Sequence, residues 1–134
     1  MSSFTVVNPP ALGAPRGYSH GLLAPKDARL LFVAGQTAAD PAGTVVSLGL
    51  ADQFDAALGK VLAVVAAAGG APEHIGSMTI FVTDLEQYLA QRSALSGTWV
   101  RHMGTHYPAI ALVEVTKLVE GRAVVEIQAT AAIP

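Results

Sequence analysis

The spacing of the apolar residues changes along the chain, and this change limits the folds that the sequence can adopt. Residues 29–36 (RLLFVAGQ) form a dense β-rich run, which is typical of a buried strand. Across residues 50–65, apolar residues instead recur every three or four positions, a pattern that predicts an amphipathic helix. Gly69-Gly70 end that helix, and residues 75–82 (IGSMTIFV) predict the next strand. Strands and helices therefore share one α+β fold.

The other segments complete a predicted order of β-β-β-α-β-α-β-β. Further strands are expected over residues 3–7, 17–23, 110–115 and 123–132. A second helix is expected to begin after Thr83 or Asp84 and to end at Gly104, because apolar residues again recur at helical spacing. Two helices cannot cover both faces of a six-stranded sheet, so we expect a single mixed sheet with both helices on one face. Residues 1–134 are predicted to form one domain.

The low charge content indicates that part of the surface is covered by other copies of the chain. Charged residues make up 13% of the 134 residues and hydrophobic residues 51%. The usual charged share is about 25%. A monomer of this size needs charge to cover its outside. We therefore predict an oligomer in which the helix-free faces of the sheets pack together.

Composition also excludes several classes of function. The chain has no cysteine, which excludes disulfides, thiolate metal sites and cysteine nucleophiles. A net charge of −2 gives no case for binding nucleic acid or an anionic membrane. The longest apolar stretch, residues 61–71, is too short to span a bilayer. Residues 1–10 (MSSFTVVNPP) lack the pattern of a secretory signal, so we expect a soluble, cytoplasmic protein.

Several short motifs follow one another in a fixed order from about Arg16 to Ile133. They are GYSH at 17–20, LFVAGQ at 31–36, the Gln53 helix, FVTDL at 81–85, YPA at 107–109, VEV at 113–115 and VVEIQA at 124–129. In this order and spacing they resemble the RidA family of reactive-intermediate deaminases, also called YjgF-type or L-PSP proteins. The resemblance implies a chorismate-mutase-like fold and a homotrimer with ligand clefts between subunits. It also implies hydrolysis of enamines or imines, such as 2-aminoacrylate, to 2-oxoacids and ammonia without a metal or cofactor.

The sequence departs from the family at the residue that binds the substrate carboxylate. The resemblance implies an arginine after a Pro-Ala pair, and this chain has Ile110 after Pro108-Ala109. An isoleucine cannot make the bidentate, charge-assisted pair that a guanidinium makes with a carboxylate. Losing such a pair costs on the order of 2–5 kcal/mol. We therefore expect weak activity on the standard 2-imino acids, with Ala109 and Ile110 at the ligand site. The chain resembles the arginine-lacking members of the family.

Arg92 is a candidate for the missing positive charge. It lies on the apolar stripe of the second helix, four residues after Tyr88 and seven before Trp99. In the family this position is commonly an asparagine near the cleft. A charge on an apolar stripe must be paired or face a cleft, since leaving it buried and unpaired is very costly. Two interpretations stay open: a structural salt bridge, which can cross the subunit interface, and a relocated anion clamp.

Glu126 and Tyr18 are the other two candidate site residues. Polar and apolar residues alternate over 124–129, so Glu126 is predicted to face away from the helices, where subunits should meet. A carboxylate there can hold and activate a water molecule, as the resemblance implies, and the alternative is an interface ion pair. Tyr18 matches the family's cleft tyrosine. Its ring and hydroxyl suit a cleft wall, with plain packing as the alternative.

Other polar residues are expected to be structural. We expect Glu114 to make structural hydrogen bonds and His20 to be a surface or hydrogen-bonded residue. His102 and His106 have the i, i+4 spacing of a metal site, but Gly104 lies between them and no third ligand follows. Two classes of function remain: a cofactor-independent deaminase and a non-catalytic ligand-binding or regulatory trimer. RNA cleavage ranks third, because the chain has no basic patch.

Overall fold

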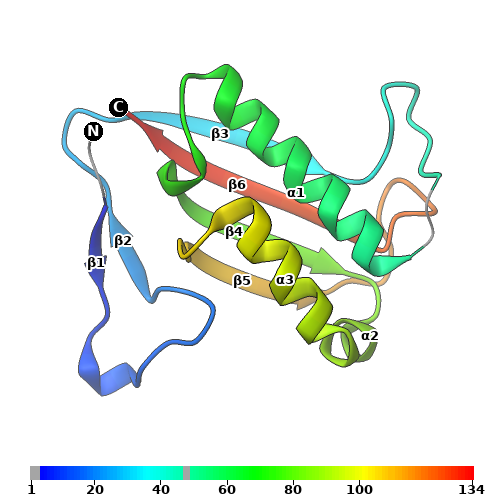
Figure 1. The fold of residues 1–134 in the computed structure, drawn as a ribbon, viewed down its shortest axis with the longest axis horizontal. Helices are drawn as coiled ribbons and strands as arrows, with labels where there is room; N and C mark the ends of the chain where they lie inside the picture. Colours follow the sequence, from blue (N-terminus) through cyan, green and yellow to red (C-terminus); the bar gives the residue numbers. More distant parts are fainter. Residues whose placement is uncertain (1–3, 47–48) are drawn as a thin grey trace.

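A four-stranded mixed sheet forms the centre of the fold (Figure 1). The computed structural model describes residues 4–46 and 49–134. The strands of this sheet are β3 (Arg29–Gln36), β4 (Ile75–Val82), β5 (Ala109–Glu114) and β6 (Val125–Ile133). They lie in the order β3-β6-β4-β5, with β4 and β5 parallel and the other pairs antiparallel. The predicted strands at 29–36 and 75–82 are confirmed, and the last two differ at their ends by one or two residues.

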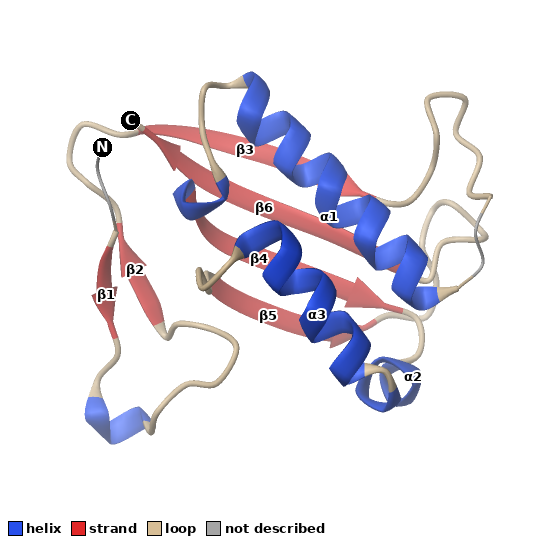
Figure 2. Ribbon diagram, in the orientation of Figure 1, coloured by secondary structure: helices blue, strands red, loops and turns tan. Residues whose placement is uncertain are grey.

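Two helices cover one face of this sheet (Figure 2). They are α1 (Leu50–Ala67) and α3 (Arg92–Met103). The apolar stripe of α1 is buried because Phe54, Leu58 and Val61 are each at most 1% exposed. These side chains belong to one core with the inward-facing residues of β4 and β6, such as Ile80 and Ile127. No helix in the described part of the chain is long and apolar enough to cross a membrane.

The second predicted helix is divided, which corrects the expectation of one helix between Asp84 and Gly104. A short helix, α2 (Leu85–Ala90), precedes α3, and Gln91 between them has φ −103° and ψ 15°. Both ends of the prediction hold, because Asp84 accepts a hydrogen bond from the Gln87 amide (3.0 Å) and α3 ends at Gly104 with φ 62°. The first residue of α2 donates a backbone hydrogen bond to the Glu114 side chain at the end of β5 (Ala109–Glu114), whereas α3 packs against α1. The chain therefore bends at the junction.

The single six-stranded sheet predicted from the sequence is also wrong. β1 (Thr5–Val7) and β2 (Gly21–Leu23) pair only with each other and lie beyond one end of the main sheet (Figure 1), in the part of the chain that the structure describes. The Ser19 amide donates to the Pro108 carbonyl (3.0 Å) and the Ser19 hydroxyl to the Tyr107 carbonyl (2.7 Å). These bonds hold the segment before β2 at the turn before β5, away from the edge of β3. The strand expected over 17–23 is shortened for the same reason, and Ser3 of the expected first strand lies outside the described residues.

No helix in residues 4–46 or 49–134 covers the second face of the main sheet. It carries Leu30 and Phe32 on β3, which are 63% and 76% exposed, and Val113 on β5, which is 40% exposed. Glu126 and Gln128 on β6 alternate with buried residues and so point to this face as well. The predicted placement of both long helices on one face is confirmed. A partner on the open face stays a prediction.

Candidate functional site

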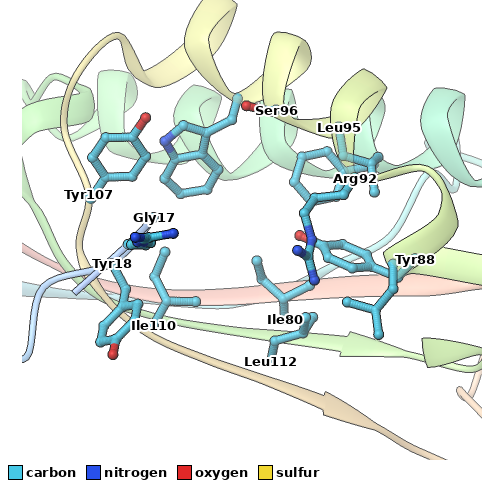
Figure 3. A pocket seen from close by; sticks show the side chains of 14 residues that line it. Gly17, Tyr18, Ile80, Tyr88, Arg92, Leu95, Ser96, Tyr107, Ile110 and Leu112 are labelled. Carbon is cyan, nitrogen blue, oxygen red and sulfur yellow. The ribbon is translucent and has the colours of Figure 1, made fainter. Parts of the chain in front are cut away.

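A cavity of about 650 Å³ lies between α3 and the β5 edge of the sheet. Its floor is apolar and consists of Ile80 on β4 and of Ile110 and Leu112 on β5 (Figure 3). Its walls come from α2, from α3, from the turn before β5 and from the segment before β2. A pocket of this size, with an apolar lining and a few polar groups, is typical of a small-molecule site.

Two stacked aromatic side chains form one wall of the cavity. The rings of Trp99 and Tyr107 lie 6.0 Å apart at an interplanar angle of 8°. The Trp99 Nε1–H donates to the His106 carbonyl (3.2 Å), and the Tyr107 carbonyl accepts the hydrogen bond from Ser19. Trp99 is only 7% exposed. This wall is therefore fixed by packing and hydrogen bonds on both sides.

Arg92 is the first residue of α3, and its side chain points into the cavity beside Tyr88 (Figure 3). Burial raises the pKa of the Tyr88 hydroxyl, and the positive charge of Arg92 acts in the opposite direction, so the two groups interact electrostatically. Among the described residues, Arg92 has no ion pair or hydrogen bond. A salt bridge within the described part of the chain is therefore absent. The guanidinium is available to an anion from outside the chain.

Tyr18 lies between this cavity and a smaller hollow of about 320 Å³. Ala109 lines only the smaller hollow, whereas Ile110 lines both. His20 supports Tyr18: their rings contact edge to face at 5.2 Å, and the His20 Nε2 is 2.9 Å from the Gly13 carbonyl oxygen. The expectation that His20 is a hydrogen-bonded residue is thus confirmed.

Glu126 lies on the opposite face of the sheet and does not line the cavity of its own chain. Its carboxylate lies across the backbone of Gly35 on β3, at a place where any Cβ at position 35 would overlap it. In the described part of the chain, Glu126 makes no hydrogen bond or ion pair. Of the predicted site residues, the structure brings Tyr18, Arg92 and Ile110 into one cavity. Within a single chain, it does not bring Glu126 to them.

The remaining polar candidates connect elements of the fold. Glu114 accepts a hydrogen bond from the Leu85 amide at the start of α2 (2.9 Å), which confirms its structural role. The His102 Nε2 lies 2.5 Å from Asp55 Oδ1 and so joins α3 to α1. This hydrogen bond, with help from Arg101, holds the pKa of the Asp55 carboxyl below its usual value. No group of three His, Asp or Glu residues among those the structure describes is arranged to hold a metal ion.

Sequence reasoning missed one charged residue of the cavity and misread the role of two aromatic ones. Arg16 lines the cavity, and its only signal in the sequence was its place directly before the Gly17-Tyr18 motif. Tyr88 and Trp99 were expected only as part of an apolar helix stripe, but both also line the cavity. Tyr88 lies four residues before Arg92 and Trp99 seven residues after it, and this helical spacing could have identified both as neighbours of Arg92 in the cavity. A stripe that contains an unpaired charge borders a cavity as well as a core.

Residues 9–133 match the family model described as endoribonuclease L-PSP. No curated protein matches the sequence. Three similar solved structures are YyfB, a Rid-family protein of unknown function from Yersinia pestis, TdcF from E. coli with bound serine, and the YjgF gene product from E. coli.

These three structures are similar to this chain over nearly their whole length. YyfB has a TM-score of 0.84 at 25% identity, covering 98% of this chain and 99% of its own. TdcF has a TM-score of 0.69 at 28% identity, covering 100% of this chain and 99% of its own. The YjgF product has a TM-score of 0.68 at 28% identity, covering 98% of each chain.

Proposed function

The chain belongs to the endoribonuclease L-PSP family of Rid and YjgF-type proteins, and from this premise we propose that it hydrolyses a small imine or enamine in the α3–β5 cavity. The observation that carries the proposal is Arg92, a guanidinium without a partner among the described residues that points into this cavity. The product would be an oxo acid and ammonia. The chemistry involves no electron transfer, so it requires no redox cofactor.

Arg92 would bind the carboxylate of the substrate. Ile110 on the cavity floor carries no charge, so Arg92 on α3 would supply the positive charge in place of the missing arginine on β5. A planar guanidinium can make two parallel hydrogen bonds to a carboxylate. The TdcF structure contains bound serine, an amino acid with the carboxylate group that Arg92 would bind. Tyr18 would form part of the wall next to the bound molecule.

Glu126 would be supplied by a neighbouring copy in a homotrimer. Its own sheet separates it from the cavity of the same chain, and it has no polar partner within the described residues. The open sheet face around it carries exposed apolar side chains such as Phe32. Packing of these faces would bury the apolar residues. Because the cavity of the next subunit lies on the helix side of its sheet, Glu126 would reach that cavity around the subunit's β5 edge.

The proposed reaction uses the Glu126 carboxylate twice. The carboxylate takes a proton from water while the water oxygen attacks the carbon of the protonated imine, and the C=N electron pair moves to nitrogen. The resulting carbinolamine then accepts the same proton on nitrogen. The C–N bond breaks, ammonia leaves with the bonding pair, and the C–OH group becomes C=O by giving its proton to solvent water. One water is consumed, and Glu126 returns to its charged form.

A second candidate function is that of a non-catalytic binding protein with the same cavity. The observation that favours it is the lining of the cavity. Among the described residues, this lining contains no acidic side chain, and its neutral polar groups are the tyrosine hydroxyls, Ser96 and the Trp99 N–H, which is already bonded to the His106 carbonyl. In that case Arg92 would hold a carboxylate ligand without turnover. Binding of small carboxylates without ammonia release from any imine would select this function.

RNA cleavage, which the family description names, is disfavoured by the charge of the chain. Eight Lys and Arg residues face ten Asp and Glu residues, for a net charge of −2. RNA-binding surfaces neutralise several phosphates with clustered basic side chains. A single-stranded RNA that stays intact and unbound at low salt would agree with this ranking.

The proposed activity is tested by ammonia release from imines that an amino-acid oxidase generates in the same solution. We expect the protein to accelerate hydrolysis of at least one imine, and Glu126→Gln to lower the rate by about a hundredfold or more. Glu86→Gln, which removes an exposed carboxylate on α2, is the matched control and should leave the rate unchanged. Absence of acceleration for every imine tested would rule out the deaminase.

Position 110 gives a second test of the same activity. Ile110→Arg places a guanidinium on the cavity floor and should raise the rate on small 2-imino acids, for which the wild type is expected to be weak. Leu112→Arg, on the same strand and lining the same cavity, tests whether the position or only the charge matters. Equal rates for the wild type and Ile110→Arg would show that the missing arginine does not limit activity.

A further inference from the structure

Among the residues that the structure describes, two arginines and no acidic residue line the α3–β5 cavity. We propose that it binds a ligand with two anionic groups joined by an apolar body, such as a dicarboxylic acid or its imino derivative. This inference rests on the proposed function, in which the same cavity binds the substrate. It adds that the ligand carries a second anionic group, which a single arginine would not require.

The two arginines lie at different ends of the cavity. Arg92 is at the end with Tyr88, whereas Arg16 directly precedes Gly17, which lies with Tyr107 at the other end (Figure 3). Neither guanidinium makes an ion pair or a hydrogen bond within the described residues. Two like charges without counter-ions among the described residues favour a positive potential at both ends of the cavity.

The segment that carries Arg16 is fixed to the wall of the cavity. Gly17 has a φ of +74°, so the chain turns sharply directly after Arg16 at a residue type suited to this conformation. Two residues later, Ser19 makes both of its hydrogen bonds to the carbonyls of Tyr107 and Pro108. Arg16 is therefore held beside the cavity by its neighbours in sequence.

Between the two arginines, the cavity is apolar. Ile80, Ile110 and Leu112 form the floor, and the stacked rings of Trp99 and Tyr107 form a wall. The volume of about 650 Å³ is in the middle of the range of about 300–1,000 Å³ for pockets that bury larger organic ligands. A three-carbon imino acid would fill little of it. An apolar body of several carbons would cover the floor and place an anionic group at each arginine.

Trp99 provides a direct measurement of binding. It is the only tryptophan of the chain and lines the cavity, so its fluorescence is a probe of ligand binding there. The titrations use pairs of acids with equal carbon number: hexanoate with adipate, and octanoate with suberate. The two diacids differ in length and are flexible, so together they cover a range of distances between the two guanidinium groups.

We expect at least one diacid to bind about tenfold more tightly than its matching monoacid, as a second charge-assisted pair predicts. Arg16→Gln should lower diacid affinity to the monoacid level and leave the monoacid unchanged. Arg92→Gln should weaken both acids. Arg101→Gln, on the same helix as Arg92 but bonded to Thr98 and outside the cavity, is the control and should change neither.

The possible failures are distinguishable. Equal affinity for monoacid and diacid, with both lost in Arg92→Gln, would overturn the two-anion inference and leave the single clamp of the proposed function. Absence of binding by every acid to the wild type would overturn the proposed site itself. If Arg16→Gln lowers the mass of the oligomer and the diacid preference is absent, Arg16 pairs with a neighbouring copy, and the inference is wrong.

Discussion

The carboxylate of Glu126 and the backbone of Gly35 occupy adjoining space on the open face of the sheet. A Cβ at position 35 would overlap the carboxylate, although the φ of Gly35 is not one that requires glycine. The missing side chain at position 35 therefore leaves room for the Glu126 carboxylate. The backbone conformation of Gly35 itself does not require glycine. Because a carboxylate is the mobile end of a flexible side chain, it can turn away from a new methyl group at little energetic cost.

Gly35→Ala is accordingly expected to lower imine hydrolysis strongly while changing stability little. The displaced Glu126 would lose its position, so the rate should fall in the same direction as in Glu126→Gln, by roughly tenfold or more. The free energy of unfolding, measured by urea denaturation, should change by less than about 1 kcal/mol. Unchanged activity would show that the carboxylate does not need this position.

Gly97→Ala is the matched control for this substitution. Gly97 lies in α3, where an added Cβ meets no atom within 4 Å. Alanine in a helix is favoured over glycine by about 0.5–1 kcal/mol, so this variant should be slightly more stable. Its activity should equal that of the wild type.

The interaction of Arg92 with Tyr88 can be measured through the tyrosine hydroxyl. Burial raises the pKa of Tyr88, and the positive charge of Arg92 lowers it by favouring the tyrosinate. Arg92→Gln should therefore raise the Tyr88 pKa further, as followed by NMR of ¹³C-labelled tyrosine with Tyr88→Phe to assign the signal. A pKa that falls or stays constant would place the guanidinium away from the cavity.

At the scale of elements, the sequence predicted which segments form strands and helices better than how they join. The spacing of apolar residues determined α1, β3 and β4, because each buries a regular face. The position of β2 depends on the hydrogen bonds of Ser19 to a turn almost ninety residues later, which no local pattern encodes. The position of Arg16 in the cavity depends on the same contacts. Arg92 could be recognised because a charge interrupts an apolar stripe.

The contact between α1 and α3 includes a polar pair that makes stability depend on pH. The hydrogen bond from His102 is the main cause of the low pKa of Asp55. A carboxyl whose pKa is lower in the folded state stabilises the protein above its unfolded pKa, and this contribution disappears as the pH falls through the folded pKa. Asp55 is 44% exposed, so screening by solvent limits the effect to less than about 1 kcal/mol.

Asp55→Asn should therefore reduce the free energy of unfolding at pH 7 by up to about 1 kcal/mol. The difference from the wild type should close as the pH falls below about 4, where the unfolded carboxyl becomes protonated. Urea denaturation at several pH values measures both quantities. Asp27→Asn, in the exposed turn before β3, is the control, and an equal loss there would assign the effect to net charge.

At the scale of the whole molecule, the open sheet face is the surface on which assembly would depend. Phe32 is 76% exposed and Leu30 63%, on a face that also carries Glu126. Exposed apolar groups of this size are uncommon on a monomer with few charges and are typical of an interface. The same face must be buried if one subunit supplies Glu126 to the cavity of another.

If the protein is the proposed trimer, Phe32→Glu is expected to convert it into monomers, as measured by light scattering or analytical ultracentrifugation. A charge in the centre of the packed faces would be desolvated without a partner. The fold of the single chain should survive, because the side chain is already exposed in it. Val100→Glu, at a site 52% exposed on α3, is the matched control and should leave the mass unchanged. A wild type that is monomeric at micromolar concentration would contradict the trimer.

The most direct test of a site shared between subunits is complementation between two inactive variants. Arg92→Gln and Glu126→Gln are each unfolded, mixed in equal amounts and refolded together, and ammonia release from an imine that the wild type hydrolyses is compared with that of each variant alone. If Arg92 of one subunit acts with Glu126 of the next, about a quarter of the sites in a random mixture contain both native residues, and activity returns to about that fraction of the wild type. If both residues act within one chain, no chain in the mixture has both. A mixture as inactive as its two components would then contradict the proposed site.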